Sequence, residues 1–349
     1  MMYELTDGYE ACRIINGYWQ LSAKHNENQT STPVEDTAEF VDAGLTTFDC
    51  ADHYTGVEEL LGEFRNWYRR ERGTDPSVQI HTKIVPDRNR LESVSRAYIE
   101  GIVDRSRRRL CVDALDLVQF HWWDYSVENY VDAARHLADL RDEGKIRHIG
   151  VTNFDAVRLE DLLDAGVPVV SNQVQYSLLD TRPEREMVDL CERRDMKLLC
   201  YGTLAGGFLT SKFAGEPDPG EATDLENRSL TKYKLIIEEV GGWEAYQNLL
   251  GTVSDIADKH GVSIANVATR YVLEKPRVGS AIVGARNTRH IESNQRTLAF
   301  ELDDEDHRSI EVARARLAEV PGGVYSVERD RDSRHAKIMN YNLNQKQDD

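Results

Sequence analysis

The strongest constraint on the fold is a repeat in which short apolar, β-branched runs alternate with longer amphipathic segments along most of the 349 residues. Strands buried on both faces read as continuous apolar runs, because helices cover both sides of a parallel sheet. Eight runs have this character: Arg13–Trp19, Thr46–Cys50, Val78–Val85, Ala114–His121, His148–Asn153, Val169–Tyr176, Lys197–Leu204 and Gly279–Gly284.

The segments between the runs are typical of crossover helices. After the second run, apolar residues recur at helical spacing, namely Val57, Leu60, Leu61, Phe64 and Tyr68. Thr55 and Glu58 have the spacing of a capping box, and Gly73 is expected to end this helix. Further crossovers are expected at Leu91–Leu110, Val127–Glu143, Ala156–Ala165 and Glu184–Arg194. Eight strand–helix units predict an α/β fold, a (β/α)8 TIM barrel, with a doubly wound sheet as the alternative.

The domain boundaries are placed where the strand–helix repeat ends. Residues 1–321 are expected to form one barrel domain, interrupted by a long loop at 211–243 that contains EPDPGEATD. Loops of this length after a barrel strand often cover a substrate. Residues 322–349 form a polar, charged tail. It is either disordered or held against the barrel or a neighbouring subunit by Tyr325, Ile338, Met339, Tyr341 and Leu343.

Composition excludes several classes of partner. The chain has 43 Lys and Arg against 61 Asp and Glu, a net charge of −18, which disfavours nucleic acid or an anionic membrane. No run approaches the ~18 apolar residues of a membrane span, and the start lacks a signal-peptide pattern. The five cysteines form no CxxC pair, which indicates reduced thiols in a cytoplasmic protein. A homo-oligomer remains open.

Four residues near the expected strand ends could carry chemistry. The functional end of a TIM barrel is formed by the C-terminal ends of its strands. Asp49 ends the second run, Tyr54 follows it, Lys83 lies near the end of the third, and His121 ends the fourth. Asp49 and Lys83 alone could be a structural ion pair, because buried charges are costly unless paired. Tyr54 and His121 at neighbouring ends favour a catalytic group.

These residue types suit the reduction of a carbonyl. Hydride addition leaves a developing alkoxide, which needs a proton and electrostatic support. A phenol has a pKa near 10, and a nearby ammonium lowers it. A carboxylate holds that ammonium in place and keeps it charged. An imidazole on the opposite wall can form a hydrogen bond with the carbonyl and orient it.

Longer segments around these residues resemble the aldo-keto reductase superfamily, and its larger bacterial-type members in particular. They are GYWQLS, FDCADHYTGVEELLG, GKIRHIGVTNF, NQVQYSLL, YGTLAGGFL and IVGARNTRHIESN, and together the resemblance spans about residues 12–315. The match implies that Asp49, Tyr54, Lys83 and His121 form the catalytic tetrad. The tyrosine loop, YTGVEE, is shorter than the usual YGxGxSE form of the family.

The resemblance also implies a cofactor, NADPH/NADP+, bound without a GxGxxG motif. Tyr201 would stack on the nicotinamide, and Thr152, Asn153 and Gln173 would hold its carboxamide. The turn with Gly202, Leu204 and Gly206 would follow the pyrophosphate, and the adenosine end would meet Gly284, Arg286, His290 and Asn294. Because a guanidinium suits a 2′-phosphate, Arg286 beside Arg289 favours NADP over NAD. Trp19 and Trp122 would line the substrate mouth, and no metal is expected.

The sequence therefore predicts an NADPH-dependent oxidoreductase that reduces an aldehyde or ketone, with sugar-derived carbonyls among the candidates and the proton coming from Tyr54. Two alternatives stay open. One is a cofactor-binding regulatory subunit with little turnover. The other is an enzyme acting mainly as an alcohol or sugar dehydrogenase.

Overall fold

The computed structural model describes residues 1–22 and 32–344. Its centre is a closed barrel of eight strands in the order β10-β3-β4-β5-β6-β7-β8-β9, and all neighbouring pairs are parallel. The TIM barrel prediction is confirmed, and each predicted run contains one strand or overlaps it. The strands are β3 (Ile14–Gly17), β4 (Thr47–Asp49), β5 (Gln79–Ile84), β6 (Leu115–Phe120), β7 (Ile146–Thr152), β8 (Val169–Gln175), β9 (Lys197–Tyr201) and β10 (Val278–Gly284).

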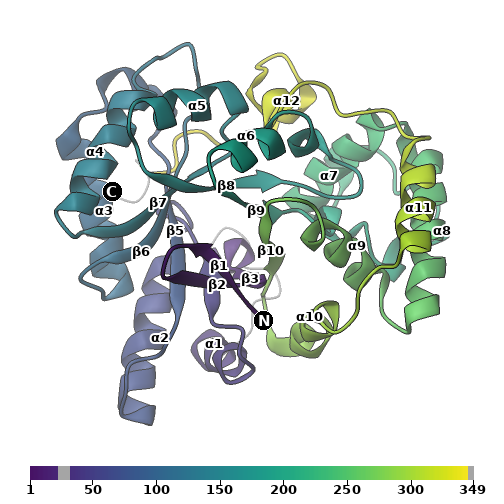
Figure 1. The fold of residues 1–349 in the computed structure, drawn as a ribbon, viewed down its shortest axis with the longest axis horizontal. Coiled ribbons are helices and arrows are strands. Elements are labelled where there is room, and N and C mark those ends of the chain that lie inside the picture. The colour runs from purple at the N-terminus through teal and green to yellow at the C-terminus, as the bar shows by residue number, and fades with distance from the viewer. Residues whose placement is uncertain (23–31, 345–349) are drawn as a thin grey trace.

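Helices surround the barrel (Figure 1). The predicted crossovers are present, although the one expected at Leu91–Leu110 starts later, at Arg96, because its first residues belong to the 3-10 helix η3 (Arg88–Ser93). The α-helices are α1 (Pro33–Asp42), α2 (Val57–Arg72), α3 (Arg96–Leu110), α4 (Tyr130–Asp142), α5 (Ala156–Asp164), α6 (Met187–Arg193), α7 (Arg228–Glu239), α8 (Gly242–His260), α9 (Ile264–Leu273), α10 (Ile291–Thr297), α11 (Asp304–Arg314), α12 (Ser326–Arg329) and α13 (Arg334–Lys337).

The start of α2 differs from the sequence prediction. The capping box is absent, because the residue that precedes the helix is Gly56, with φ 84°, and no side chain caps the helix. Glu58 instead turns inward and accepts a hydrogen bond of 2.6 Å from Thr82 Oγ1. The predicted stop is confirmed, since Gly73 caps the C-terminus with φ 72°, a conformation that favours glycine.

An N-terminal hairpin that the sequence analysis did not predict closes one end of the barrel. It consists of β1 (Met2–Thr6) and β2 (Tyr9–Cys12), which pair antiparallel. Leu5 packs against apolar side chains from inside the barrel, namely Ile15, Leu117, Leu199 and Ile282. The Tyr9 hydroxyl lies 3.1 Å from Nε2 of His81, near the start of β5. The hairpin therefore covers the N-terminal ends of the strands (Figure 1).

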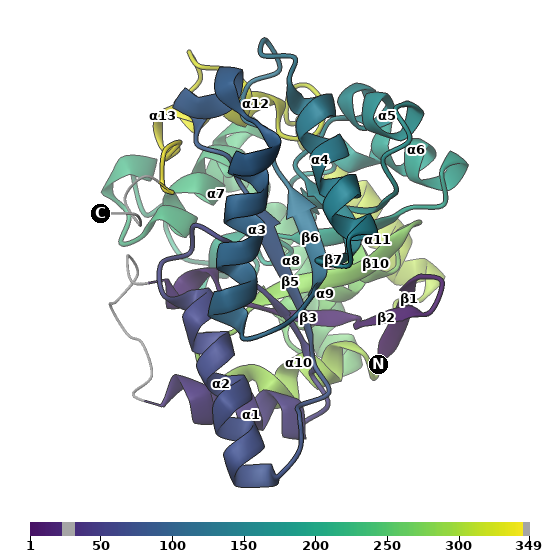
Figure 2. The same cartoon turned by 90° about the vertical axis from the view of Figure 1, so that its left-hand side faces the viewer.

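The C-terminal tail folds over the other end. Figure 2 shows α13 and the hairpin on opposite sides of the barrel. Nη2 of Arg329 donates to the carbonyl oxygens of Trp122 and Asn153, at the ends of β6 and β7. Asn344 is buried, and its Nδ2 donates to Oδ2 of Asp52 at 3.0 Å. In the structure, described tail residues between 322 and 344 therefore pack against the barrel, and residues 345–349 lie outside the described part of the chain.

The long loop at 211–243 is partly helical, since it contains α7. Tyr233 of α7 packs against the glycine turn that follows β9. All five cysteines lie in the described residues and are free thiols, four buried and Cys111 exposed. Within the described ranges no helix combines the length and apolar character needed to cross a membrane.

Candidate active site

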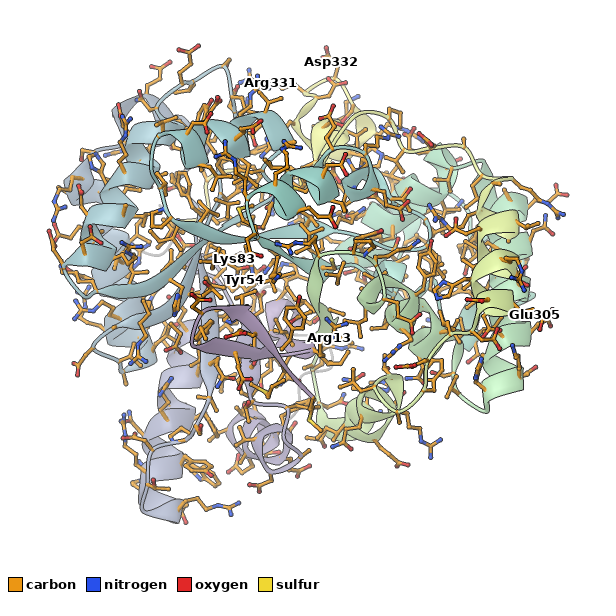
Figure 3. The ribbon with its side chains drawn as sticks, viewed as in Figure 1. Arg13, Tyr54, Lys83, Glu305, Arg331 and Asp332 are labelled. Atoms are coloured by element: carbon orange, nitrogen blue, oxygen red, sulfur yellow. The ribbon has the colours of Figure 1, made fainter. Side chains whose placement is uncertain are left out.

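Asp49 and Lys83 form a buried ion pair at the C-terminal ends of the adjacent strands β4 and β5. Figure 3 labels Lys83, with Tyr54 beside it. Nζ of Lys83 lies 2.5 Å from Oδ1 of Asp49, and it also donates to the carbonyl oxygen of Cys50 at 3.0 Å. Burial by itself would lower the pKa of Lys83, but the charge of Asp49 outweighs that effect and the pKa is raised. The ammonium is therefore charged throughout the physiological range.

Two glutamines complete the contacts of Asp49. Nε2 of Gln119 donates to Oδ2 of Asp49 at 2.9 Å, and Nε2 of Gln173 donates to the same oxygen at 2.6 Å. Gln173 also donates to Oε1 of Gln119 at 2.7 Å. Sequence reasoning missed Gln119, although a polar residue inside the apolar run LDLVQF is a usable signal. A carboxylate with three donors holds the ammonium in one place.

Tyr54 lies beside this pair. Its backbone closes a tight turn, accepting from the amide of Val57 at 3.0 Å, and Nζ of Lys83 lies 5.1 Å from the centre of its ring. Burial raises the pKa of Tyr54 to about 12, and the charge of Lys83 opposes this without overcoming it. The ammonium therefore lowers this pKa as expected, but burial has the larger effect. At neutral pH the phenol is a proton donor and not a base.

His121 faces the site in a defined tautomer. Its Nδ1 lies 3.0 Å from the carbonyl oxygen of Thr152. Because a carbonyl oxygen only accepts hydrogen bonds, Nδ1 carries the proton. Nε2 is buried and has no partner among the described residues. Burial lowers the pKa of His121 to about 3, with help from the charge of Arg329, so the ring is neutral and offers a lone pair.

The residues expected around a carboxamide end strands β7, β8 and β9. The Tyr201 hydroxyl donates to Oδ1 of Asn153 at 2.8 Å, which leaves Nδ2 of Asn153 free of described partners. The amide nitrogen of Gln173 is already used by Asp49 and Gln119, and its Oε1 has no described partner. The hydroxyl of Thr152 donates to the carbonyl oxygen of Gln173. One free donor and one free acceptor thus belong to residues whose backbones are joined by a hydrogen bond of 2.8 Å.

The glycine turn after β9 is held against α7. Gly202 and Gly206 have φ of 77° and 67°, and a Cβ on either would meet the Tyr233 ring at under 3.0 Å. Leu204 is half-buried, and its carbonyl oxygen accepts from the amide of Gly207. Lys232 of α7 places its ammonium 4.8 Å from the centre of the Tyr201 ring. In this structure, therefore, α7 covers the turn and the face of Tyr201.

The residues after β10 lie open to solvent. Gly284, Arg286 and His290 are exposed, whereas Asn294 is largely buried in α10. The side chains of Arg286 and Arg289 form no ion pair with any described residue, in contrast to most of the other arginines on the chain. Two uncommitted guanidiniums at one strand end suit a phosphate.

The aromatic residues near the mouth differ from the expectation. Trp122 is fully buried, and its indole nitrogen donates to the carbonyl oxygens of Asp124 and Val127. It packs against Phe120 in the outer core, so it does not line the mouth. Its neighbour Trp123 lies edge-on to His121, with ring centres 4.3 Å apart. Trp19 starts the 3-10 helix η1 (Trp19–Leu21) directly after β3 and is half-buried.

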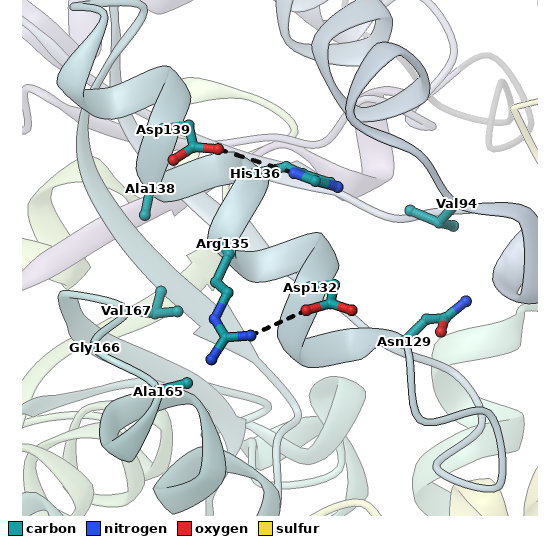
Figure 4. Close-up of a pocket in the computed structure, with 10 residues that line it drawn as sticks. All are labelled: Val94, Asn129, Asp132, Arg135, His136, Ala138, Asp139, Ala165, Gly166 and Val167. Atoms are coloured by element: carbon teal, nitrogen blue, oxygen red, sulfur yellow. Dashed lines mark hydrogen bonds and ion pairs between the residues drawn. The ribbon is translucent and has the colours of Figure 1, made fainter.

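Two other features lie away from the strand ends. A hollow of about 500 Å³ lies along α4, and its walls carry the pairs Arg135–Asp132 and His136–Asp139 (Figure 4). His260, Asp303 and Asp306 lie close enough to ligate a cation. Lys259, however, already places its ammonium 2.7 Å from both carboxylates. Neither feature contacts the tetrad.

Comparison with known protein sequences gives consistent matches. The sequence model of the Aldo/keto reductase family matches residues 13–315. The aldo-keto reductase YhdN of Bacillus subtilis (strain 168) is 30% identical over 310 residues, which cover 87% of this chain and 90% of that protein. Flagellar radial spoke protein 5 of Chlamydomonas reinhardtii is 31% identical over 258 residues, 64% of this chain, and the match spans only 49% of that longer protein.

Solved structures show the same architecture. The glycerol dehydrogenase AKR11B4 from Gluconobacter oxydans superposes with a TM-score of 0.74, covering 92% of this chain and 97% of that chain at 23% identity. At this level of identity the similarity concerns the fold alone. It supports the closed eight-stranded barrel.

Proposed function

The chain belongs to the aldo/keto reductase family, and from that premise we propose that it reduces an aldehyde or ketone to an alcohol with NADPH, taking the proton from Tyr54. The observation that carries the proposal is the network in which Asp49 fixes Lys83 beside the Tyr54 ring. A purely structural ion pair would not need a phenol at the open end of the barrel.

Each residue of the proposed site has a separate role in the reaction. When bound, the reduced nicotinamide supplies the hydride. Tyr54 donates its hydroxyl proton to the oxygen on which negative charge develops, and the ammonium of Lys83 stabilises the phenolate that is left. Asp49, held by Gln119 and Gln173, keeps the ammonium in position and charged. Because the pKa of Tyr54 is about 12, the donor stays protonated at neutral pH, as the reduction requires.

His121 orients the substrate by accepting a hydrogen bond from it. Since its Nδ1 proton is given to Thr152, Nε2 can accept a hydrogen bond but cannot donate one. This suits the hydroxyl of the alcohol, or a hydroxyl next to the carbonyl, better than the carbonyl oxygen itself. Tyr54 is then the donor to that oxygen.

The free polar groups fit a nicotinamide cofactor. A primary carboxamide needs a donor for its oxygen and an acceptor for its NH2 group, and Asn153 Nδ2 and Gln173 Oε1 offer these. Tyr201 would support the ring. Arg286 and Arg289 would meet a 2′-phosphate, which is the reason to prefer NADPH. The cover formed by α7 over Tyr201 must shift for a ring to stack there.

The test is Tyr54→Phe. We expect NADPH to bind as in the wild type, measured by quenching of protein fluorescence, and turnover on a panel of aldehydes to fall by about 10³-fold or more because the proton donor is lost. Tyr98→Phe is the control, since that tyrosine lies on α3 and its hydroxyl accepts from the amide of Asp87. Retained turnover in Tyr54→Phe would disprove the role of Tyr54. A wild type that binds NADPH but reduces no aldehyde would support the regulatory-subunit alternative.

A further inference from the structure

A small cavity opens beside the active site. Its volume is about 220 Å³, and its walls include Arg88, Arg329, Arg331, Asp124, Trp123 and Tyr341. Arg88 begins η3, Trp123 and Asp124 follow β6, and the other three come from the tail that crosses the mouth. Figure 3 shows Arg331 at the outer edge of the molecule, near the top of the view. The cavity is therefore a joint product of the barrel and the tail.

Aromatic side chains in edge-to-face contact connect the wall of the cavity to His121. Trp123 lies 4.3 Å from His121, ring centre to ring centre. The Tyr341 ring lies 5.1 Å from that of Trp123, and the guanidinium of Arg88 lies 4.9 Å from the centre of Tyr341. From the catalytic imidazole, a path of aromatic side chains thus leads outward to a positive charge.

The charges in the cavity do not balance. Asp124 is the one carboxylate in its wall, and its Oδ2 already pairs with Arg88 at 3.2 Å and Arg331 at 2.5 Å. The other carboxylate oxygen accepts from the amide and the hydroxyl of Ser126. Three guanidiniums against one carboxylate leave a local excess of two positive charges, on a chain whose net charge is −18.

Arg329 differs from the other two arginines in the wall of the cavity. It forms no ion pair with any acid among the described residues, and its two hydrogen bonds go to backbone carbonyls. Its Nε and Nη1 are buried without a partner. The guanidinium lies 4.2 Å from the centre of the Tyr125 ring and 5.1 Å from that of Tyr325. Arg329 is half-buried, but buried donors without an acceptor are costly, and a bound anion that accepts from them offsets that cost.

We propose that this cavity is a subsite for an anionic group, a carboxylate or a phosphate, carried by the carbonyl substrate. The proposal rests on the proposed function and narrows it to acidic aldehydes and ketones. The anionic end would lie among Arg88, Arg329 and Arg331, and the carbonyl would reach Tyr54 past Trp123. Guanidinium groups pair with both kinds of anion through two parallel hydrogen bonds.

The experiment compares matched acidic and neutral substrates. One pair is 4-carboxybenzaldehyde and methyl 4-formylbenzoate, which differ by one charge at nearly the same shape. A second pair, glyceraldehyde 3-phosphate and glyceraldehyde, distinguishes a phosphate preference from a carboxylate preference. For the wild type we expect kcat/KM to be at least tenfold higher for the acidic member of one pair.

Variants locate the effect. The double variant Arg88→Gln, Arg331→Gln leaves one guanidinium against Asp124, and we expect it to reduce the acid-to-neutral ratio by about tenfold. The control is Arg334→Gln, on the same tail, because that guanidinium pairs with Glu238 outside the cavity. The control should keep the wild-type ratio. A ratio that falls equally in the control would overturn the assignment of the cavity.

A binding measurement separates this proposal from the proposed reaction. Calorimetry with NADP+ present compares 4-(hydroxymethyl)benzoate with its methyl ester. Tighter binding of the acid, lost in the double variant, supports the subsite whether or not any aldehyde is reduced. Equal binding of acid and ester, together with equal kcat/KM for both substrate pairs, overturns it and leaves the proposed reductase activity standing.

Discussion

The two sides of the barrel mouth differ in how firmly other residues hold their polar side chains in place. On the side of β4 to β8, Asp49, Lys83, Gln119 and Gln173 hold one another in a closed set of hydrogen bonds. On the side of β10, Arg286 and Arg289 are exposed and uncommitted. The first side has its geometry before any ligand arrives, and the second offers charges that a ligand must organise.

This difference indicates which interactions act on the reaction and which act on binding. Groups that are fixed in advance stabilise a transition state without reorganising, so their loss lowers turnover. Groups that become ordered only on the ligand contribute to affinity and discrimination, and exposed charges contribute modestly. The predictions below test this division, beginning with the change expected to have the largest effect.

The largest effect is expected when Lys83, which belongs to the hydrogen-bonded set around Asp49, is replaced. Lys83→Met leaves the Asp49 carboxylate buried without its counter-charge, which costs about 3–5 kcal/mol of folding stability. Turnover should fall by about 10³-fold, because the developing phenolate loses its support. Kinetics and urea unfolding measure the two effects. Asp49→Asn combined with Lys83→Met should recover stability but not turnover, and Lys337→Met, an exposed lysine, should change neither.

A second test changes one charge behind the Tyr54 loop. Burial raises the pKa of Glu58 to about 7, while the hydrogen bond from Thr82 opposes the shift. A carboxyl whose folded-state pKa is raised contributes stability below its unfolded pKa of about 4.5 and loses it as pH rises through 7. We expect the wild type to lose on the order of 3 kcal/mol from this group across that window.

Glu58→Gln mimics the protonated carboxyl, so the contribution of this group to the pH dependence should disappear. Urea unfolding at pH 5 and pH 8 measures the difference between wild type and variant. Glu59→Gln serves as the control, because Glu59 is the neighbouring exposed residue. If Glu58→Gln and the wild type keep the same difference between the two pH values, Glu58 is ionised alike in the folded and unfolded chains.

The smallest expected effect lies on the open side. Arg286→Ala should weaken NADPH binding by about five- to tenfold and leave NADH binding unchanged, because only NADPH carries the 2′-phosphate. Fluorescence titration with both cofactors gives the ratio, and Arg308→Ala, an exposed arginine on α11, is the control. Equal weakening of NADPH binding and NADH binding would show that Arg286 does not contact the 2′-phosphate. A large loss of turnover would contradict the division between the two sides.

The same division explains what could be predicted from the sequence. The eight strands and the positions of Asp49, Lys83 and His121 at their ends follow from runs buried on both faces. Gln119 lies in such a run too, but its role depends on where Asp49 points, which only the closed barrel defines. The hairpin β1–β2 was not predicted, because its strands are short and partly exposed.

Features that depend on side-chain direction were the least predictable. Trp122 and Trp123 are equivalent in the sequence, yet only Trp123 faces His121. One residue along a strand end reverses the direction of a side chain. Glu58 has the spacing of a capping residue, but its carboxylate turns to Thr82, a contact between two separate elements. The protonation of His121 likewise depends on Thr152, from a different strand.

Because the tail forms part of the barrel mouth, the mouth is complete only after the C-terminal residues have been synthesised. Asn344 reaches back to Asp52, two residues before Tyr54 in the chain, and Tyr325 lies next to His121. The ribosome makes residues 322–344 only after all eight barrel strands. During synthesis the residues proposed to be catalytic are therefore made before the tail that forms part of the cavity wall. If the cavity is the proposed anion subsite, discrimination among substrates is acquired after the residues of the candidate tetrad have been made.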